Sequence, residues 1–337
     1  MSAWSRLSGL ALTYSGYIKR VEECSYYPTR LWIEVTSNCN LKCGFCGNRQ
    51  LTKEQRGNMD FDLYRRITDE CAGKVGQFNL FHRGESLLHP RLAEMIVYAG
   101  QRGIRTRINT NATLLSNSTA KELINAQLDI ITFSFDGYDA ETYEANRPNA
   151  CFEKSLGNIL GFLAMKKELG SAKPFVGLEV MEIADKSSEV FAKERRAFLK
   201  QFEGLPLDKF ILRRQHNWAG MIDTGRQAPS TRIACPLLWH ALVVFWDGRV
   251  LPCPQDFFGA LELGNANEQG IMEIWNGFEL RQLRREMANP NTLSRHPCVE
   301  CDRIMRRTFA GVPTDYLGRF LSENVFGNSW LSRILPH

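Results

Sequence analysis

Three cysteines, Cys39, Cys43 and Cys46, lie close together in the first part of the chain with the spacing C-x3-C-x2-C. Thiolates on one short loop can each bind one iron of a [4Fe–4S] cube, and such cubes normally take four cysteines. Three cysteines leave one iron open to a small molecule. A structural zinc site needs a fourth Cys or His close by, whereas the next histidine along the chain is His82. The spacing therefore favours an iron–sulfur cluster over zinc.

This loop resembles the signature of the radical S-adenosylmethionine (radical SAM) superfamily, in which an aromatic residue, here Phe45, precedes the last cysteine. The resemblance implies that S-adenosylmethionine chelates the open iron. It also implies that one electron from the cluster cleaves the sulfonium, and that the resulting 5′-deoxyadenosyl radical removes a hydrogen atom from a substrate. Phe45 is accordingly expected at the cofactor.

Apolar patterns typical of strands and helices alternate from residue 31 onward. Six strands joined by helices predict a parallel sheet with right-handed crossovers, and the resemblance implies an α/β fold with a partial (β/α)6 barrel. Functional residues should lie at the carboxyl ends of such strands. Asp60 is the expected N-cap of the first helix. The strands are predicted at 31–35, 78–81, 104–109, 130–135, 175–181 and 209–212, and the helices at 61–71, 89–102, 116–126, 152–169 and 188–202.

The segment after the second strand looks like a variant of the family's Gly-Gly-Glu-Pro motif, which contacts the methionyl amino group. Gly84 and Glu85 match the motif, whereas Arg83 replaces its first glycine and Ser86 its proline. The resemblance implies that Gly84 and Glu85 bind the cofactor. The replacement predicts a cation, Arg83, near the cofactor or the substrate.

Two further strand ends carry polar residues that resemble family motifs. Asn109 and Asn111 are similar to a Thr-Asn-Gly turn, and Ser134 and Asp136 match a Ser-x-Asp-Gly segment. The resemblance implies that these four residues line the S-adenosylmethionine pocket. Asn and Asp-Gly are also common turn formers, which is the alternative interpretation.

Four residues are candidates for contact with the substrate. Glu179 interrupts an apolar strand and needs a polar partner if it is buried. His216 belongs to a polar and aromatic cluster after the sixth strand. Cys151 lies in a loop near Arg147, where a thiol could return a hydrogen atom to a substrate radical and so give epimerisation. The alternative for Cys151 is a small apolar residue.

A second set of cysteines, Cys235, Cys253, Cys298 and Cys301, follows the predicted barrel. A hairpin around Asp247-Gly248 brings the first two to one end, and the last two form a C-x2-C pair. Four thiolates suit zinc or a complete [4Fe–4S] cluster. The segment resembles the SPASM or shorter twitch auxiliary-cluster domains, which favours a cluster. No cysteine follows Cys301, so we expect one auxiliary cluster, held entirely by protein ligands.

The composition of the chain limits its possible binding partners and its location. The 337 residues carry a net charge of +5 and 44% hydrophobic residues, and no apolar run of 18 residues occurs. The small surplus of positive charge does not argue for nucleic-acid binding, and a membrane span is not expected. Seven of the ten cysteines fall into metal-type groups, which predicts a cytoplasmic location. The basic runs at 102–107 and 213–214 are interpreted as solvated faces rather than as a site for an anionic substrate.

We expect four parts: a helical extension at 1–30, the barrel at 31–225, the auxiliary domain at 226–310 and a tail at 311–337. The extension leaves little room for the leader-binding module of many peptide-modifying relatives. A nearby auxiliary cluster suits removal of an electron from a substrate radical. The sequence therefore predicts a radical SAM oxidoreductase that acts on a small, carbohydrate-like or aminocyclitol-like molecule, with a one-electron reductant such as flavodoxin or ferredoxin. The alternatives are a radical epimerase, a peptide-modifying enzyme and a non-catalytic iron–sulfur electron carrier.

Overall fold

The computed structural model describes residues 3–183, 186–213, 215, 217–222, 232–306, 308–309 and 312–313, with side chains between residues 9 and 306. Its main sheet has the strand order β6-β5-β4-β3-β2-β1-β7-β8-β9. The first six strands are mutually parallel and adjacent in chain order, which confirms the predicted partial barrel. These strands are β1 (Arg30–Ile33), β2 (Gln77–Asn79), β3 (Arg105–Thr110), β4 (Ile130–Phe135), β5 (Phe175–Met181) and β6 (Lys209–Arg213).

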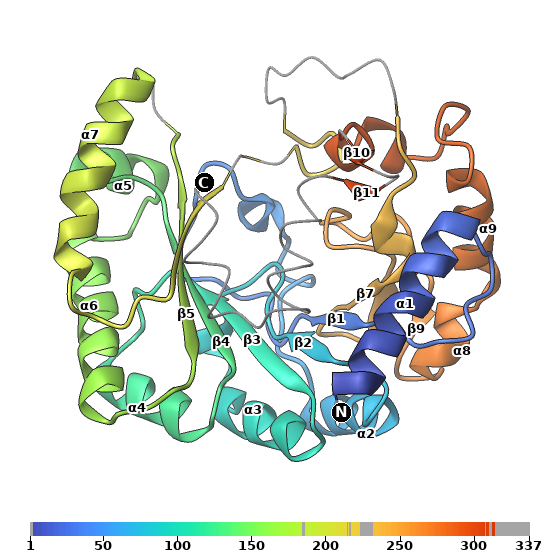
Figure 1. Ribbon diagram of the computed structural model, residues 1–337, viewed down its shortest axis with the longest axis horizontal. Helices are drawn as coiled ribbons and strands as arrows, with labels where there is room; N and C mark the ends of the chain where they lie inside the picture. The colour runs from blue at the N-terminus through green and yellow to red at the C-terminus, as the bar shows by residue number, and fades with distance from the viewer. Residues whose placement is uncertain are drawn as a thin grey trace.

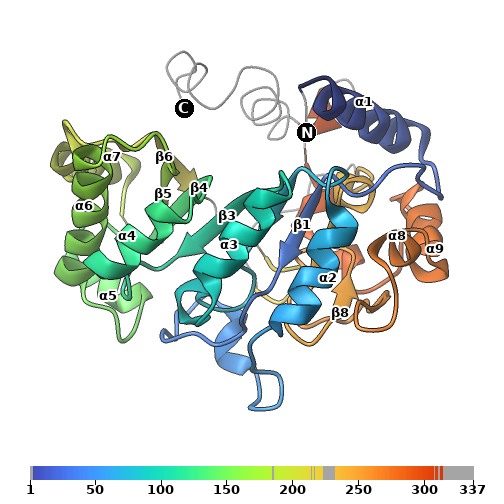
Figure 2. The same cartoon turned by 90° about the horizontal axis from the view of Figure 1, so that it is seen from below.

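Helices cover the outer face of this sheet, as both views of the ribbon show (Figures 1 and 2). In α2 the residues Leu63, Tyr64, Ile67 and Cys71 are buried, which is the spacing of an apolar face on a helix. The sequence predicted five of the helices and missed the short α5. The six are α2 (Phe61–Cys71), α3 (Leu92–Gln101), α4 (Asn117–Asn125), α5 (Ala140–Asn146), α6 (Phe152–Glu168) and α7 (Ser188–Leu199).

Asp60 caps the amino end of α2, as predicted, because its Oδ1 accepts hydrogen bonds from the backbone N–H groups of Asp62 and Leu63 at 2.8 and 3.2 Å. We expect Asp60→Ala to lower the free energy of unfolding by about 1 kcal/mol. Asp62→Ala is the matched control: it removes the same charge from the same turn, its side chain is 86% exposed, and it caps nothing. Equal losses of stability in urea denaturation of the two variants would contradict the capping role.

The segment that carries the second cysteine set extends the same sheet. Strand β7 (Ala241–Val244) pairs in parallel with β1, from Arg30 opposite Ala241 to Ile33 opposite Val244. Strands β8 (Arg249–Leu251) and β9 (Gly264–Asn265) then add antiparallel neighbours. The predicted hairpin is therefore confirmed, and it joins the barrel edge rather than standing apart from it. The predicted boundary at 225/226 lies outside the described residues.

Helix α1 (Ala3–Lys19) confirms a helical amino-terminal segment and lies on the side of the hairpin, near α8 (Ile271–Trp275) and α9 (Phe278–Met287) (Figures 1 and 2). The Tyr17 hydroxyl donates to the Ala234 carbonyl at 3.0 Å, and its ring meets Trp239 edge-on at 5.6 Å. This helix thus packs against the residues around Cys235. None of the helices within the described ranges has the length and apolar character needed to cross a bilayer. The predicted tail at 311–337 lies, apart from β11 (Val312–Pro313), outside the described residues.

Candidate active site

A cavity of about 730 Å³ follows the inner face of the sheet. This volume falls within the range of small-molecule and cofactor sites. The lining contains the three cysteines of the first loop and residues at the carboxyl ends of β2, β3, β4, β5 and β6. Twelve of the predicted site residues line it together: Cys39, Cys43, Phe45, Cys46, Gly84, Glu85, Asn109, Asn111, Ser134, Asp136, Arg147 and Glu179.

The three cysteines of the first loop have sulfur atoms in a water-poor setting. Burial raises the pKa of the Cys39 thiol to about 12 and that of Cys43 to about 11, and it also raises the pKa of Cys46. Neutral thiols are therefore the stable form without a cation, and thiolates here need a positive centre beside them. Three half-buried cysteines that line one cavity fit an iron–sulfur cluster with an open iron.

Gly84 and Glu85 fasten the turn after β2 to the cysteine loop. A Cβ at Gly84 would collide with the backbone carbonyls of Thr36 and Asn38, so only glycine fits there. The buried Glu85 carboxylate accepts from the backbone N–H of Asn111 at 2.8 Å and of Leu87 at 3.1 Å. Burial raises the pKa of Glu85, although these hydrogen bonds oppose the shift. The segment thus forms a fixed wall of the cavity beside Cys39.

The ends of β3 and β4 present hydrogen-bonding groups to the same cavity. Ser134 Oγ donates to Asn109 Oδ1 at 2.8 Å. Asp136 is 1% exposed, and its Oδ2 accepts from Arg147 Nε at 2.7 Å. Burial raises the pKa of Asp136 against the effect of Arg147. Arg147 is therefore held by a buried ion pair at the wall, next to the cysteine loop.

Arg83, the cation predicted near the cofactor or the substrate, lines the cavity and is paired with a carboxylate of the protein. Its Nε and Nη2 each lie 2.6 Å from a carboxylate oxygen of Glu34, and its guanidinium carbon lies 3.5 Å from the centre of the Phe245 ring. Glu34 is fully buried, and a buried carboxylate requires a counter-charge. The positive charge of Arg83 is balanced by the Glu34 carboxylate. Together with the contact to Phe245, this ion pair joins the turn after β2 to β1 and to the hairpin.

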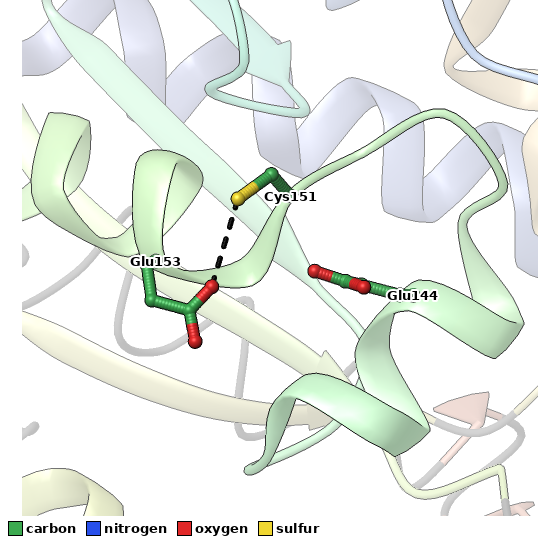
Figure 3. Close-up of side chains that lie close together, drawn as sticks. All are labelled: Glu144, Cys151 and Glu153. Carbon is green, nitrogen blue, oxygen red and sulfur yellow. Dashed lines mark hydrogen bonds between the residues drawn. The ribbon is translucent and has the colours of Figure 1, made fainter.

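The residues predicted to contact the substrate do not all lie at the cavity. Glu179 faces the cavity, whereas Cys151 is exposed and is not among the described residues that line it. Figure 3 shows Cys151 beside Glu144 and Glu153, with its sulfur 3.6 Å from a Glu153 carboxylate oxygen. His216 lies outside the described residues. The structure thus brings Glu179 and Arg147, and not Cys151, to the cavity.

The second set of cysteines gathers at the hairpin. Cys235 precedes a short 3-10 helix, and Cys253 follows β8. Cys298 begins another 3-10 turn, and Cys301 follows its last residue. Burial, followed by the charge of the neighbouring Cys235, raises the pKa of Cys253 to about 12. Burial, followed by the other three cysteines, likewise raises the pKa of Cys298.

The four thiols lie near enough to one another at the hairpin to interact electrostatically. Four cysteines in one place can hold a zinc ion or a [4Fe–4S] cluster.

Sequence reasoning misjudged the arginines of β3 and β6. Arg105, Arg107 and Arg213 line the cavity instead of forming solvated faces. The signal was present, because side chains two residues apart on a strand share a face. Asn109 was expected to face inward, and Arg105 and Arg107 precede it by four and two residues.

Comparison with known proteins supports the chemistry that this geometry allows. Residues 33–165 match the family described as the radical SAM superfamily, and residues 235–302 match an iron–sulfur cluster-binding domain, SPASM. The chain is 33% identical over 163 residues to a tungsten-containing aldehyde ferredoxin oxidoreductase cofactor-modifying protein of Pyrococcus furiosus. That match spans 45% of this chain and 43% of the relative.

Two other similarities extend over most of the chain. An S-adenosyl-L-methionine-dependent 2-deoxy-scyllo-inosamine dehydrogenase of Niallia circulans is 23% identical, over 82% of this chain and 93% of its own length. The crystal structure of BtrN in complex with AdoMet and 2-DOIA superimposes with a TM-score of 0.54 at 18% identity, covering 87% of this chain and 97% of that one. At that identity the structural likeness shows the fold.

Proposed function

We infer the activity of this chain from its membership of the radical S-adenosylmethionine superfamily, with a radical SAM domain at 33–165 and a SPASM iron–sulfur domain at 235–302. We propose that it cleaves S-adenosylmethionine reductively and abstracts a hydrogen atom from a small polar substrate in the cavity. The net reaction proposed is oxidation, for example of a hydroxyl-bearing carbon to a ketone. One electron would leave the substrate with the hydrogen atom, and a cluster held by Cys235, Cys253, Cys298 and Cys301 would supply the acceptor for the second electron, with release of a proton.

Cys39, Cys43 and Cys46 would hold the first cluster, which together with S-adenosylmethionine supplies the carbon radical. The chain's own residues line the cavity in which that chemistry would take place. Gly84 and Glu85 form the wall beside the cysteine loop, and Asn109 and Ser134 offer hydrogen-bonding groups to the bound cofactor. Exclusion of water protects a reactive radical from side reactions.

The observation that carries the proposal of oxidation is the position of the second cysteine set. Pro254, Gln255 and Phe257, which follow Cys253, line the same cavity, as does Arg303, two residues after Cys301. A cluster held by these cysteines would lie beside the substrate and could accept its electron. The resemblance to a dehydrogenase over 82% of the chain supports the same direction. Epimerisation by Cys151 lacks such support, because Cys151 is exposed away from this lining.

The test is made on anaerobically reconstituted protein with dithionite or reduced flavodoxin. We expect about eight iron and eight sulfide per chain, four for each cube, and formation of 5′-deoxyadenosine from S-adenosylmethionine. About four iron with one zinc would contradict the auxiliary cluster. Absence of 5′-deoxyadenosine from fully loaded, reduced protein would overturn the proposed enzyme and favour an electron carrier.

A further inference from the structure

We propose that Asn48 is a positioning residue that joins a hydrogen bond on the Cys46 sulfur to the turn after β2, and so sets both the reduction potential of the first cluster and the affinity for S-adenosylmethionine. The inference rests on the proposed function and adds a residue to it. Asn48 lies two residues after the last cysteine of the first loop and is 3% exposed. It is not among the described residues that line the cavity, so it would act through neighbours that do.

The backbone of Asn48 contacts the third cysteine directly. Cys46 precedes a 3-10 turn, Gly47–Gln50, and its side chain accepts a hydrogen bond from a backbone N–H of that turn. The donor is Asn48 N, which lies 3.5 Å from Cys46 Sγ. Hydrogen bonds to the cysteine sulfurs are among the factors that set the reduction potential of an iron–sulfur cluster. Because a reduced cluster places more negative charge on its sulfurs, this N–H would favour the reduced form and raise the potential.

The side chain of Asn48 joins two segments of backbone. Its Nδ2 donates to the Ser37 carbonyl at 2.8 Å and to the Arg83 carbonyl at 2.7 Å. Ser37 lies two residues before Cys39, and Arg83 immediately precedes Gly84. One amide group therefore uses both of its hydrogens to hold the beginning of the cysteine loop against the turn that would bind the cofactor. Without this donor, two buried carbonyl groups would lose their hydrogen bonds.

Arg56 fixes the orientation of this amide. Its Nη1 donates to Asn48 Oδ1 at 3.0 Å, and its Nη2 donates to the Asn48 carbonyl oxygen at 2.7 Å. A guanidinium can only donate and a carbonyl can only accept, so the amide oxygen must face Arg56 and the amide nitrogen must face the two carbonyls. A buried polar network in which every member is paired is rigid. The position of the turn after β2 is therefore coupled to the N–H that contacts the sulfur.

The test measures two quantities on anaerobically reconstituted protein. The reduction potential is read from a redox titration followed by electron paramagnetic resonance, and the signal that changes on addition of S-adenosylmethionine identifies the cluster with the open iron. The affinity for S-adenosylmethionine is measured by calorimetric titration. In Asn48→Ala we expect the ratio of reduced to oxidised first cluster at a fixed potential to fall by about threefold or more. We also expect S-adenosylmethionine to bind at least about threefold more weakly, because the turn has lost its link to the cysteine loop.

Asn48→Asp separates the amide link from the effect of charge. This variant keeps the size of the side chain and an oxygen for Arg56, but it has no hydrogens to donate to the two carbonyls. Both quantities should therefore fall as in Asn48→Ala, which carries no added charge. Asn58→Asp is the matched control, because it adds the same charge at an exposed position of the same segment. Asn58 Oδ1 accepts from Asn38 Nδ2 at 3.2 Å, which a carboxylate can also do, so neither quantity should change.

Arg56→Gln perturbs the same amide from its other side and should lower both quantities by less than Asn48→Ala does. Parent values in Asn48→Ala, a change in only one of the two quantities, or equal changes in Asn58→Asp would overturn the inference. If circular dichroism shows that Asn48→Ala does not fold, Arg56→Gln decides, and parent values in that variant would overturn the inference.

Formation of 5′-deoxyadenosine is measured in the same samples, so that the two failures remain distinct. A parent protein that cleaves S-adenosylmethionine, with unchanged Asn48 variants, would refute the role of Asn48 alone. Loss of cleavage in the parent protein would refute the proposed function itself.

Discussion

Replacing Cys43 with alanine is expected to reduce formation of 5′-deoxyadenosine to background. Cys43 lies in the first cysteine loop and lines the cavity, and its loss leaves two thiolates for a cube that already lacks a fourth. Without that cluster the cleavage reaction has no electron source at the cofactor. We expect iron to fall from about eight to about four per chain, while circular dichroism shows that the fold is retained.

Cys301→Ala is the matched comparison because it should lose the same amount of iron, from the other site. This variant should still cleave S-adenosylmethionine, but it should yield little oxidised product because the electron acceptor is missing. Equal iron loss with opposite effects on cleavage would assign the two clusters their separate roles. If Cys43→Ala retained cleavage, or if Cys301→Ala abolished it with the first cluster intact, the assignment would be wrong.

Arg83→Met is expected to lower the free energy of unfolding by about 3–5 kcal/mol, because it leaves the Glu34 carboxylate buried without its partner. Burial alone would raise the pKa of Glu34, but hydrogen bonds from Arg83, followed by His82, outweigh it and lower the pKa. The Glu34 carboxylate is therefore charged at neutral pH. Two hydrogen bonds of 2.6 Å from the Arg83 guanidinium stabilise this buried charge. The measurement is urea denaturation of the parent and the variant.

The double variant Glu34→Leu/Arg83→Met should recover most of that loss, since replacing a buried ion pair by apolar residues is often neutral or stabilising. A surface pair provides the second control. Arg285→Met breaks the ion pair between Arg285 and Glu22, whose side chains are 67% and 41% exposed. This change should lower the free energy of unfolding by no more than about 1 kcal/mol. A double variant as unstable as Arg83→Met would show that the effect comes from packing rather than from charge.

The sequence predicted the barrel and the hairpin because their signals are local. Apolar runs that alternate with amphipathic helices indicate parallel strands, and Asp247-Gly248 between two apolar runs indicates a hairpin. The cysteine groups could be recognised for the same reason. What the sequence did not predict is the pairing of β7 with β1. Parallel neighbours separated by about two hundred residues leave no local trace in composition or spacing.

The arginines were harder to interpret because arginine is usually exposed. Arg83 was predicted near the cofactor or the substrate, but its partner could not be predicted, because Glu34 lies 49 positions earlier in the chain. The pairing of Arg107 and Arg213 with Glu179 likewise depends on the strand order β3-β4-β5-β6. Which side chains of β3 share a face could be predicted from the alternation of side chains along a strand. Which residues they contact could be seen only in the folded sheet.

The parallel pairing of β7 with β1 has a consequence for electron transfer. The first cysteine loop begins soon after β1 ends, and Cys253 follows the strand that pairs with β7. Both metal centres would therefore be anchored to one hydrogen-bonded sheet, in which β7 lies between the two strands that precede them. Their separation would be set by the backbone geometry of that sheet and would stay constant while substrates exchange.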